Sequence, residues 1–269
     1  LLAASVPVAF AMALVGAVGF AWVVSPHAAV SMITADLYQT LSSYSLTVIP
    51  LFVFMGQIAF HAGISRRLYA AAHRWMGALP GGLAMATVGA CAGFGAICGS
   101  GPATAATMTA VALPEMKRYR YGMDLAAGTV AAGGSLGMLI PPSVVFIVYA
   151  IMTEQSVGDL FLAGILPGVL IAVLFCAAIA IQCRRRPSLG PPAPKSAWRD
   201  KVRALAGVAE TLLLFALVIG GLFAGWFTPT EAASVGAAGA LILAIARRRL
   251  TWASFLQSVR ETVRTSCMV

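Results

Sequence analysis

Apolar stretches, several of them close to the length of a membrane span, alternate with short polar segments along this 269-residue chain. A helix needs about 20 consecutive apolar residues to cross the hydrocarbon core. Five stretches approach this length and are predicted as single spans: 2–24, 46–60, 160–182, 205–227 and 232–246. Two longer apolar stretches, 81–113 and 121–152, do not fit this pattern.

The charges predict how these spans are oriented. Only 10% of residues are charged and 60% are hydrophobic, which excludes a water-soluble domain. The 18 Lys and Arg residues fall into four clusters, near 66–74, 117–120, 184–203 and 247–264, whereas the loops around Asp36, Glu154 and Glu231 hold acids. The positive-inside rule places all four basic loops, and the start of the chain, in the cytoplasm. Because the basic residues lie between apolar stretches, nucleic acid is not an expected partner.

Stretch 81–113 is predicted to be a re-entrant hairpin. Basic clusters on both flanks place both of its ends in the cytoplasm, so it must cross the membrane an even number of times. Its 33 residues are too few for two full spans. Glycines and Pro102 favour a tight turn followed by a new helix, so the tip is expected at 99–102.

Stretch 121–152 must cross once, yet Pro141 and Pro142 lie at its centre. Proline lacks an N–H and disfavours helix at the preceding residue, so a break is expected at about 139–142. Non-helical backbone survives at this depth only where protein buries it or where it lines a polar cavity. Exposed carbonyls and half-helix ends at both broken elements suit a cation and an anion.

The remaining segments complete an expected organisation. Helical spacing of apolar residues at 64–76 and 252–263 predicts two amphipathic helices in the cytoplasmic interface. The proline-rich segment 184–203 is predicted to be a polar linker. We expect four regions: spans and an interfacial helix (1–80), a transport element (81–160), a span with the linker (161–204), and a connecting span with the start of a second repeat (205–269).

Enzyme chemistry has little support. No phosphate-binding loop with a lysine occurs, which disfavours ATP hydrolysis. Ser100, between two glycines, would need a general base to act as an intramembrane protease, and all three histidines fall at predicted loop or interface positions. The five cysteines form no metal-binding or disulfide pattern and are expected to be small buried hydrophobes. The chain is therefore not expected to be an enzyme.

Two motifs resemble those of a known family. The stretches GAICGSGPAT (95–104) and GSLGMLIPPS (134–143) are similar to the large membrane (M) subunit of tripartite ATP-independent periplasmic (TRAP) transporters. PVAFA (7–11), IPLFVFMG (49–56) and FTPTEAA (227–233) follow the same family order. The resemblance implies an all-α integral membrane protein with about six transmembrane helices, one re-entrant hairpin and one broken helix, forming the first half of an inverted-repeat elevator transporter.

The resemblance also implies a function. Family members take up small organic acids such as dicarboxylates or sialic acid, coupled to sodium, across the bacterial inner membrane. They work with a small four-helix membrane subunit and a periplasmic substrate-binding protein. A passive channel-like or scaffold protein is the alternative, and only a carrier would need a sodium gradient to accumulate substrate. The family's second hairpin and second proline break do not occur within these 269 residues, so the chain is expected to be an N-terminal fragment.

The family pattern also places the sodium and substrate sites at the hairpin and the proline break. The choice of individual residues within these two segments is our own prediction. Sodium is expected to bind backbone carbonyls, with Ser100 contributing its hydroxyl or carbonyl; the ligands are Cys98, Ser100, Gly137, Ile140 and Pro142. Substrate is expected to contact Gly99, Ser100, Gly101, Pro102, Thr104, Pro141 and Ser143. Cys98 stands where the family often has serine, so any ligand role there falls to its carbonyl. No organic cofactor is expected.

Overall fold

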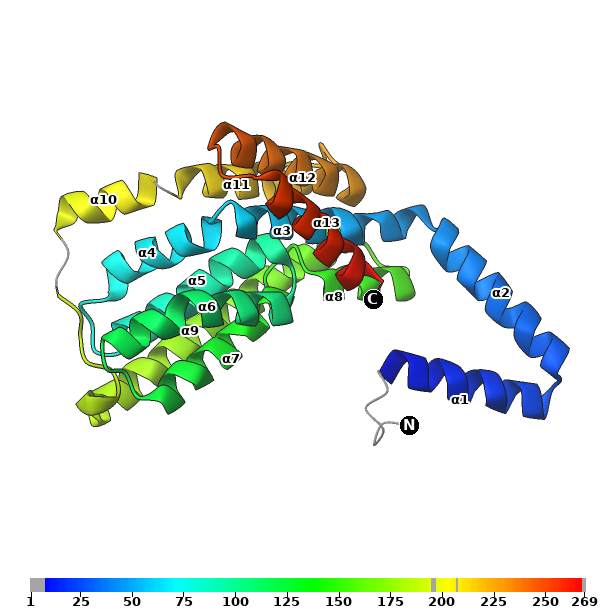
Figure 1. The fold of residues 1–269 in the computed structure, drawn as a ribbon, viewed down its shortest axis with the longest axis horizontal. Coiled ribbons are helices and arrows are strands. Elements are labelled where there is room, and N and C mark those ends of the chain that lie inside the picture. The colour runs from blue at the N-terminus through cyan, green and yellow to red at the C-terminus, as the bar shows by residue number, and fades with distance from the viewer. Residues whose placement is uncertain (1–7, 195–196, 207, 268–269) are drawn as a thin grey trace. The chain divides into compact units, whose positions relative to one another are not determined.

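A computed structural model describes residues 8–194, 197–206 and 208–267 of the chain (Figure 1). The described residues form helices and connecting loops with no strand, which confirms the expected all-α fold. They fall into two compact units, residues 1–46 and 47–269, and each is described by itself.

The first unit is a pair of helices that contact each other, α1 (Val8–Val23) and α2 (Pro26–Ser42). Residues 2–7 of the predicted first span lie outside the described part. The region around Asp36 was expected to be a loop, and this is wrong, because it lies within α2. The Ser25 hydroxyl accepts a hydrogen bond from the Ala28 N–H at 3.1 Å, and Pro26 occupies the first turn, so the helix has a strong start signal.

The second unit contains most of the predicted elements, preceded by the short 3-10 helix η2 (Tyr44–Thr47). In order, they are α3 (Val48–His61), α4 (Ile64–Met76), α5 (Gly82–Cys98), α6 (Gly101–Arg118), α7 (Met123–Leu139), α8 (Val144–Met152), α9 (Val157–Arg185), the 3-10 helix η3 (Pro187–Leu189), α10 (Trp198–Ala206), α11 (Ala209–Phe223), α12 (Pro229–Ala246) and α13 (Trp252–Ser266).

Among the described residues, three helical stretches are long and apolar enough to cross a membrane: Tyr44–His61, Val157–Arg185 and Pro229–Ala246. The pair α7 and α8 passes the same test as one span bent by 42°, which confirms the predicted break. The described part of α1, with 16 residues, and α11, with 15, are shorter than a full crossing requires. The count of six spans stays a prediction.

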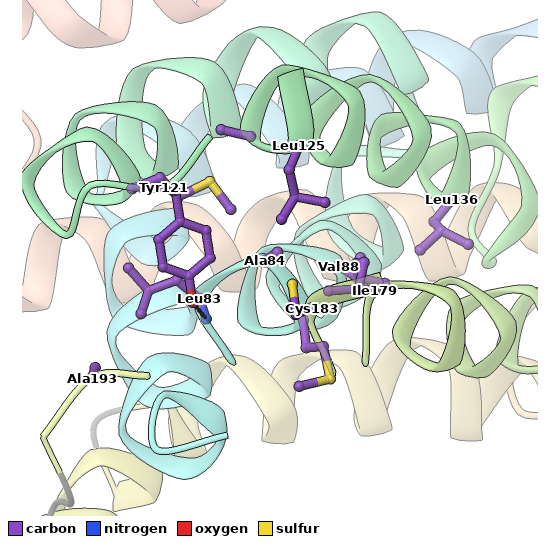
Figure 2. Close-up of a cluster of buried hydrophobic side chains, with 12 residues drawn as sticks. Leu83, Ala84, Val88, Tyr121, Leu125, Leu136, Ile179, Cys183 and Ala193 are labelled. Carbon is purple, nitrogen blue, oxygen red and sulfur yellow. Dashed lines mark hydrogen bonds between the residues drawn. The ribbon is translucent and has the colours of Figure 1, made fainter. Parts of the chain in front are cut away.

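Helices α5, α6, α7 and α9 pack side by side and form the core around the predicted hairpin and broken helix (Figure 1). Figure 2 shows the hydrophobic cluster that joins them, in which Val88 of α5 lies beside Ile179 of α9, while Leu83 of α5 and Leu136 of α7 lie at opposite ends. The Tyr121 hydroxyl accepts a hydrogen bond from the Leu83 N–H at 3.1 Å, which satisfies a donor in the buried first turn of α5.

The predicted polar linker is partly helical and packed. Residues 198–206 form α10, and Gly190 and Ala193 are buried. Three backbone hydrogen bonds of 2.8–3.0 Å join the linker to the ends of α5, α7 and α4, respectively: Gly81 N–H to Gly190 O, Gly122 N–H to Leu189 O, and Ala193 N–H to Gly77 O. The expected division into four regions stays a prediction.

Both predicted amphipathic helices form, as α4 and α13, and each packs on a neighbour. The buried side chains of α4 include Ile64 and Tyr69, and α4 lies against α5. Helix α13 lies against α3, where the Phe54 and Phe255 rings meet edge to face with centroids 6.1 Å apart. The apolar faces of these helices are therefore covered at least in part by protein.

Candidate functional site

The tip of the hairpin is a two-residue turn between α5 and α6. Gly99 ends α5 with φ of +64°, a left-handed conformation that favours glycine. Ser100 caps α6 by accepting a hydrogen bond from the Ala103 N–H at 3.5 Å, and Pro102 lies in the first turn. The predicted tip at 99–102 is confirmed, although Gly101 and Pro102 already belong to α6.

The break between α7 and α8 is held by Ser143. Pro142 has no N–H to donate to the Met138 carbonyl. The Ser143 hydroxyl donates to this carbonyl instead, at 2.6 Å. The same hydroxyl accepts a hydrogen bond from the Phe146 N–H at 3.5 Å and so caps α8. One buried side chain therefore ends one half-helix and starts the next.

The tip and the break lie against each other through backbone atoms. The Val144 N–H donates to the Gly99 carbonyl at 3.2 Å. A Cβ added to Gly99 would lie 2.7 Å from the Pro142 carbonyl oxygen, and one added to Gly95 would lie 2.6 Å from the Gly137 Cα. Real Cβ contacts are longer than 3.0 Å, so only glycine permits these approaches. The structure thus brings the two predicted halves of the site together.

Two of the predicted cation ligands have carbonyls that lack their usual helical partner. The carbonyl of residue i accepts from the N–H of residue i+4 in an α-helix. Four residues after Cys98 stands Pro102, and four after Gly137 stands Pro141, and neither proline has an N–H. The Ser100 carbonyl, in contrast, already accepts from the Thr104 N–H at 3.0 Å and from its hydroxyl at 2.8 Å.

A cavity of about 620 Å³ lies beside the tip. Five of the predicted site residues line it: Cys98, Gly99, Ser100, Gly101 and Pro102. The other predicted residues do not line this cavity: Thr104, Gly137, Ile140, Pro141, Pro142 and Ser143.

The predicted residues outside the cavity are mostly packed in the protein. The side chains of Thr104 and Ser143 are fully buried. Ile140 packs beside Gly168 of α9. These residues shape the backbone at the tip and the break, and their side chains do not face the cavity.

Several polar residues that line the cavity were not predicted. Gln57 and His61 come from α3, and Gln257, Glu261 and Thr265 come from α13. The His61 Nδ1 is 3.0 Å from the Ser258 hydroxyl and 3.0 Å from the Gln57 carbonyl oxygen, and so links α3 to α13. The predicted amphipathic pattern found α13 but gave no sign that its polar face would border the tip.

His61 was expected at a loop or interface position, yet it lines the same cavity as Ser100. Its Nδ1 lies within hydrogen-bonding distance of Ser258, and the Ser100 hydroxyl is used as the cap of α6. A protease would need the base to contact the nucleophile. Among the described contacts, the Ser100 hydroxyl therefore has a structural role as a helix cap, and no general base contacts it.

Comparison with known proteins identifies relatives along the whole chain. The family profile described as "Tripartite ATP-independent periplasmic transporter, DctM component" matches residues 1–269. The C4-dicarboxylate TRAP transporter large permease protein DctM of Pseudomonas aeruginosa is 39% identical over 216 residues, which are 80% of this chain and 50% of that protein. The relatives are transporter permease subunits and not enzymes.

Two other relatives have different named substrates. The sialic acid TRAP transporter large permease protein SiaM of Vibrio cholerae is 31% identical over 270 residues, which are 100% of this chain and 62% of that protein. The ectoine/5-hydroxyectoine TRAP transporter large permease protein UehC of Ruegeria pomeroyi is 30% identical over 228 residues, 85% of this chain and 53% of that protein. The chain thus spans between a half and two thirds of the length of these relatives.

Proposed function

This chain belongs to the DctM component family of tripartite ATP-independent periplasmic transporters, and we propose that it forms the first repeat of a sodium-coupled, elevator-type carrier of small organic acids. The observation that carries this proposal is the contact between the hairpin tip and the proline break beside a cavity. Broken elements that meet at a polar cavity are the arrangement that inverted-repeat carriers use for substrate and coupling ions.

Sodium would bind at the contact between tip and break. The carbonyls of Cys98 and Gly137 have no helical N–H partner, and oxygen ligands suit a hard cation. An unsatisfied carbonyl at bilayer depth costs several kcal/mol, so a bound cation would remove a large penalty. Ile140 and Pro142 complete the proposed carbonyl set, and Ser100 would contribute its hydroxyl, because Thr104 already occupies its carbonyl.

Substrate would bind in the cavity against the first turn of α6. Gly99, Ser100, Gly101 and Pro102 line the cavity at a helix N-terminus, where the helix dipole favours a carboxylate. We propose that Thr104, Pro141 and Ser143, which do not line it, act by shaping the tip and the break. Relatives named for C4-dicarboxylate and sialic acid support an organic acid as substrate.

The carrier would need two further proteins, a periplasmic substrate-binding protein and a small four-helix membrane subunit. It would lie in the bacterial inner membrane, with the start of the chain and the basic loops in the cytoplasm. The described helices long enough to span a membrane support a multi-pass protein.

The test is sodium-dependent uptake by the complete transporter in vesicles. A Cβ at Gly137 would lie 2.6 Å from the Thr104 hydroxyl and 3.0 Å from the Ser100 carbonyl, so Gly137→Val must disturb the tip. We expect Gly137→Val and Ser100→Ala to raise the sodium concentration for half-maximal uptake. Gly89→Val is the control, because a Cβ there meets nothing within 4 Å. Unchanged sodium dependence in both variants would remove the proposed site.

The same assay separates a carrier from a passive channel or scaffold. A carrier concentrates substrate only while a sodium gradient is imposed, whereas a pore equilibrates substrate with or without it. Accumulation that is lost when the gradient is collapsed supports the carrier. Equal flux in both conditions supports the pore.

A further inference from the structure

A second cavity, of about 440 Å³, lies between α7 and α9 at the arginine end of α9. No residue lines both this cavity and the one at the hairpin tip. One part of its wall is apolar and includes Leu125, Phe175 and Ile179. Figure 2 shows two of these, Leu125 and Ile179, which also belong to the hydrophobic cluster.

The other part of the wall is polar and carries both signs of charge. Asp124 from the first turn of α7 faces the cavity together with Gln182 and Arg186. Among the described residues, no ion pair joins Asp124 to Arg186, although both line this cavity. An adjoining hollow shares Gln182 and Arg186 and adds Arg185. The cavity thus offers a cation and a carboxylate, each able to take a charged partner.

The position of the cavity along α9 fits the boundary between hydrocarbon and headgroups. Helix α9 has 29 residues, a length of roughly 43 Å at 1.5 Å per residue, and is apolar enough to span a membrane. Three consecutive arginines, 184–186, follow its apolar part. The apolar wall therefore lies toward the acyl chains and the polar wall toward the headgroups.

We propose that this cavity binds phosphatidylethanolamine. One acyl chain would lie along Phe175 and Ile179, the phosphate would accept hydrogen bonds from Arg186 and Gln182, and the ammonium group would donate to Asp124. A guanidinium suits a phosphate, and a primary ammonium can donate hydrogen bonds to a carboxylate. Phosphatidylglycerol would offer Asp124 only neutral hydroxyl donors and no cation, and the methylated ammonium of phosphatidylcholine could not donate to it.

Native mass spectrometry of the complete, delipidated permease can test this, with phosphatidylethanolamine, phosphatidylglycerol or phosphatidylcholine added singly. We expect phosphatidylethanolamine to bind best. Arg186→Gln should weaken the binding of both phosphatidylethanolamine and phosphatidylglycerol by roughly tenfold, which corresponds to the loss of one charge-assisted hydrogen bond. Asp124→Asn should weaken the binding of phosphatidylethanolamine and leave the binding of the other two lipids unchanged.

A matched pair of glycine variants tests the cavity itself. Gly128 lines it, and a Cβ there meets nothing within 4 Å, so Gly128→Leu should fill the cavity without moving the backbone and abolish the preference. Gly89 of α5 is equally open but lies outside the cavity, so Gly89→Leu should bind as the unmodified protein does. Equal binding of all three lipids, a preference for phosphatidylglycerol, or unaltered binding by Gly128→Leu would overturn the proposal.

Discussion

Replacing Gly95 by alanine should destabilise the contact between hairpin and broken helix, because two helix backbones touch there. The added Cβ would lie 2.6 Å from the Gly137 Cα and 3.0 Å from its nitrogen. Real Cβ contacts are at least 3.0 Å and ordinary contact begins at 3.4 Å, so α5 and α7 would have to separate locally by 0.4 to 0.8 Å. Because the obstructing atoms are backbone, no side-chain rotation can relieve the overlap.

The expected cost follows from a comparison within the same helix. Overpacking a well-packed core costs about 1–3 kcal/mol. Alanine also gains about 0.5–1 kcal/mol over glycine inside a helix. Gly89→Ala receives the same gain without the overlap, because a Cβ there meets nothing within 4 Å. The propensity gain cancels between the two variants, so Gly95→Ala should be about 1–3 kcal/mol less stable than Gly89→Ala.

Thermal unfolding of the complete permease, followed with a thiol-reactive dye, can measure this difference. Cys91 and Cys98 are 0% and 4% exposed, so they react only as the core opens. A cost of 1 kcal/mol corresponds to about 2–4 °C in Tm for a chain of this size. If Gly95→Ala melts with or above Gly89→Ala, the close backbone contact between α5 and α7 is wrong.

Three further predictions test other parts of the structure. Single cysteines at Arg74 and Lys117, in a cysteine-free background, should both react only with thiol reagents on the cytoplasmic side; periplasmic labelling of either would contradict a re-entrant hairpin. Ser143→Ala should lower the free energy of unfolding by about 1–3 kcal/mol, because the Met138 carbonyl loses its donor. Ser143→Thr should recover most of the lost stability, because threonine keeps the hydroxyl. Equal Tm values for the unmodified protein and both variants would argue against the hydrogen bond from residue 143 to Met138. Residues 1–269 alone, reconstituted with the small subunit, a binding protein and a sodium gradient, should not concentrate substrate, because alternating access needs both repeats; uptake would refute the repeat argument.

The hairpin turn and the helix break could be predicted from the sequence because their causes are local. Gly99 ends one helix, Ser100 and Pro102 start the next, and two prolines interrupt α7 whatever surrounds them. Helix α2 was missed for the opposite reason. Its start signal at Ser25 and Pro26 is equally local, but the acidic segment around Asp36, between two predicted spans, was interpreted as a loop.

The polar wall of the tip cavity could not be predicted, because it depends on which helices meet. His61 and Ser258 are 197 positions apart, and nothing in either local pattern indicates that α13 packs on α3. The same holds for Asp124 and Arg186 at the second cavity. Such pairs become visible only when the packing of distant helices is known.

The packing also clarifies the departure from the family pattern at Cys98. A Cβ added to Gly56 of α3 would lie 2.7 Å from the Cys98 Cα and 3.3 Å from its Sγ, so the thiol occupies the space that this glycine leaves. The Cys98 carbonyl is the atom that lacks a helical partner, because Pro102 follows four residues later. A larger side chain at Gly56 would therefore push on the Cα and side chain of Cys98, at the α5 end of the tip. Gly56→Val should alter sodium dependence as Gly137→Val does, and uptake with normal sodium dependence in this variant would show that the support of α3 behind the tip is dispensable.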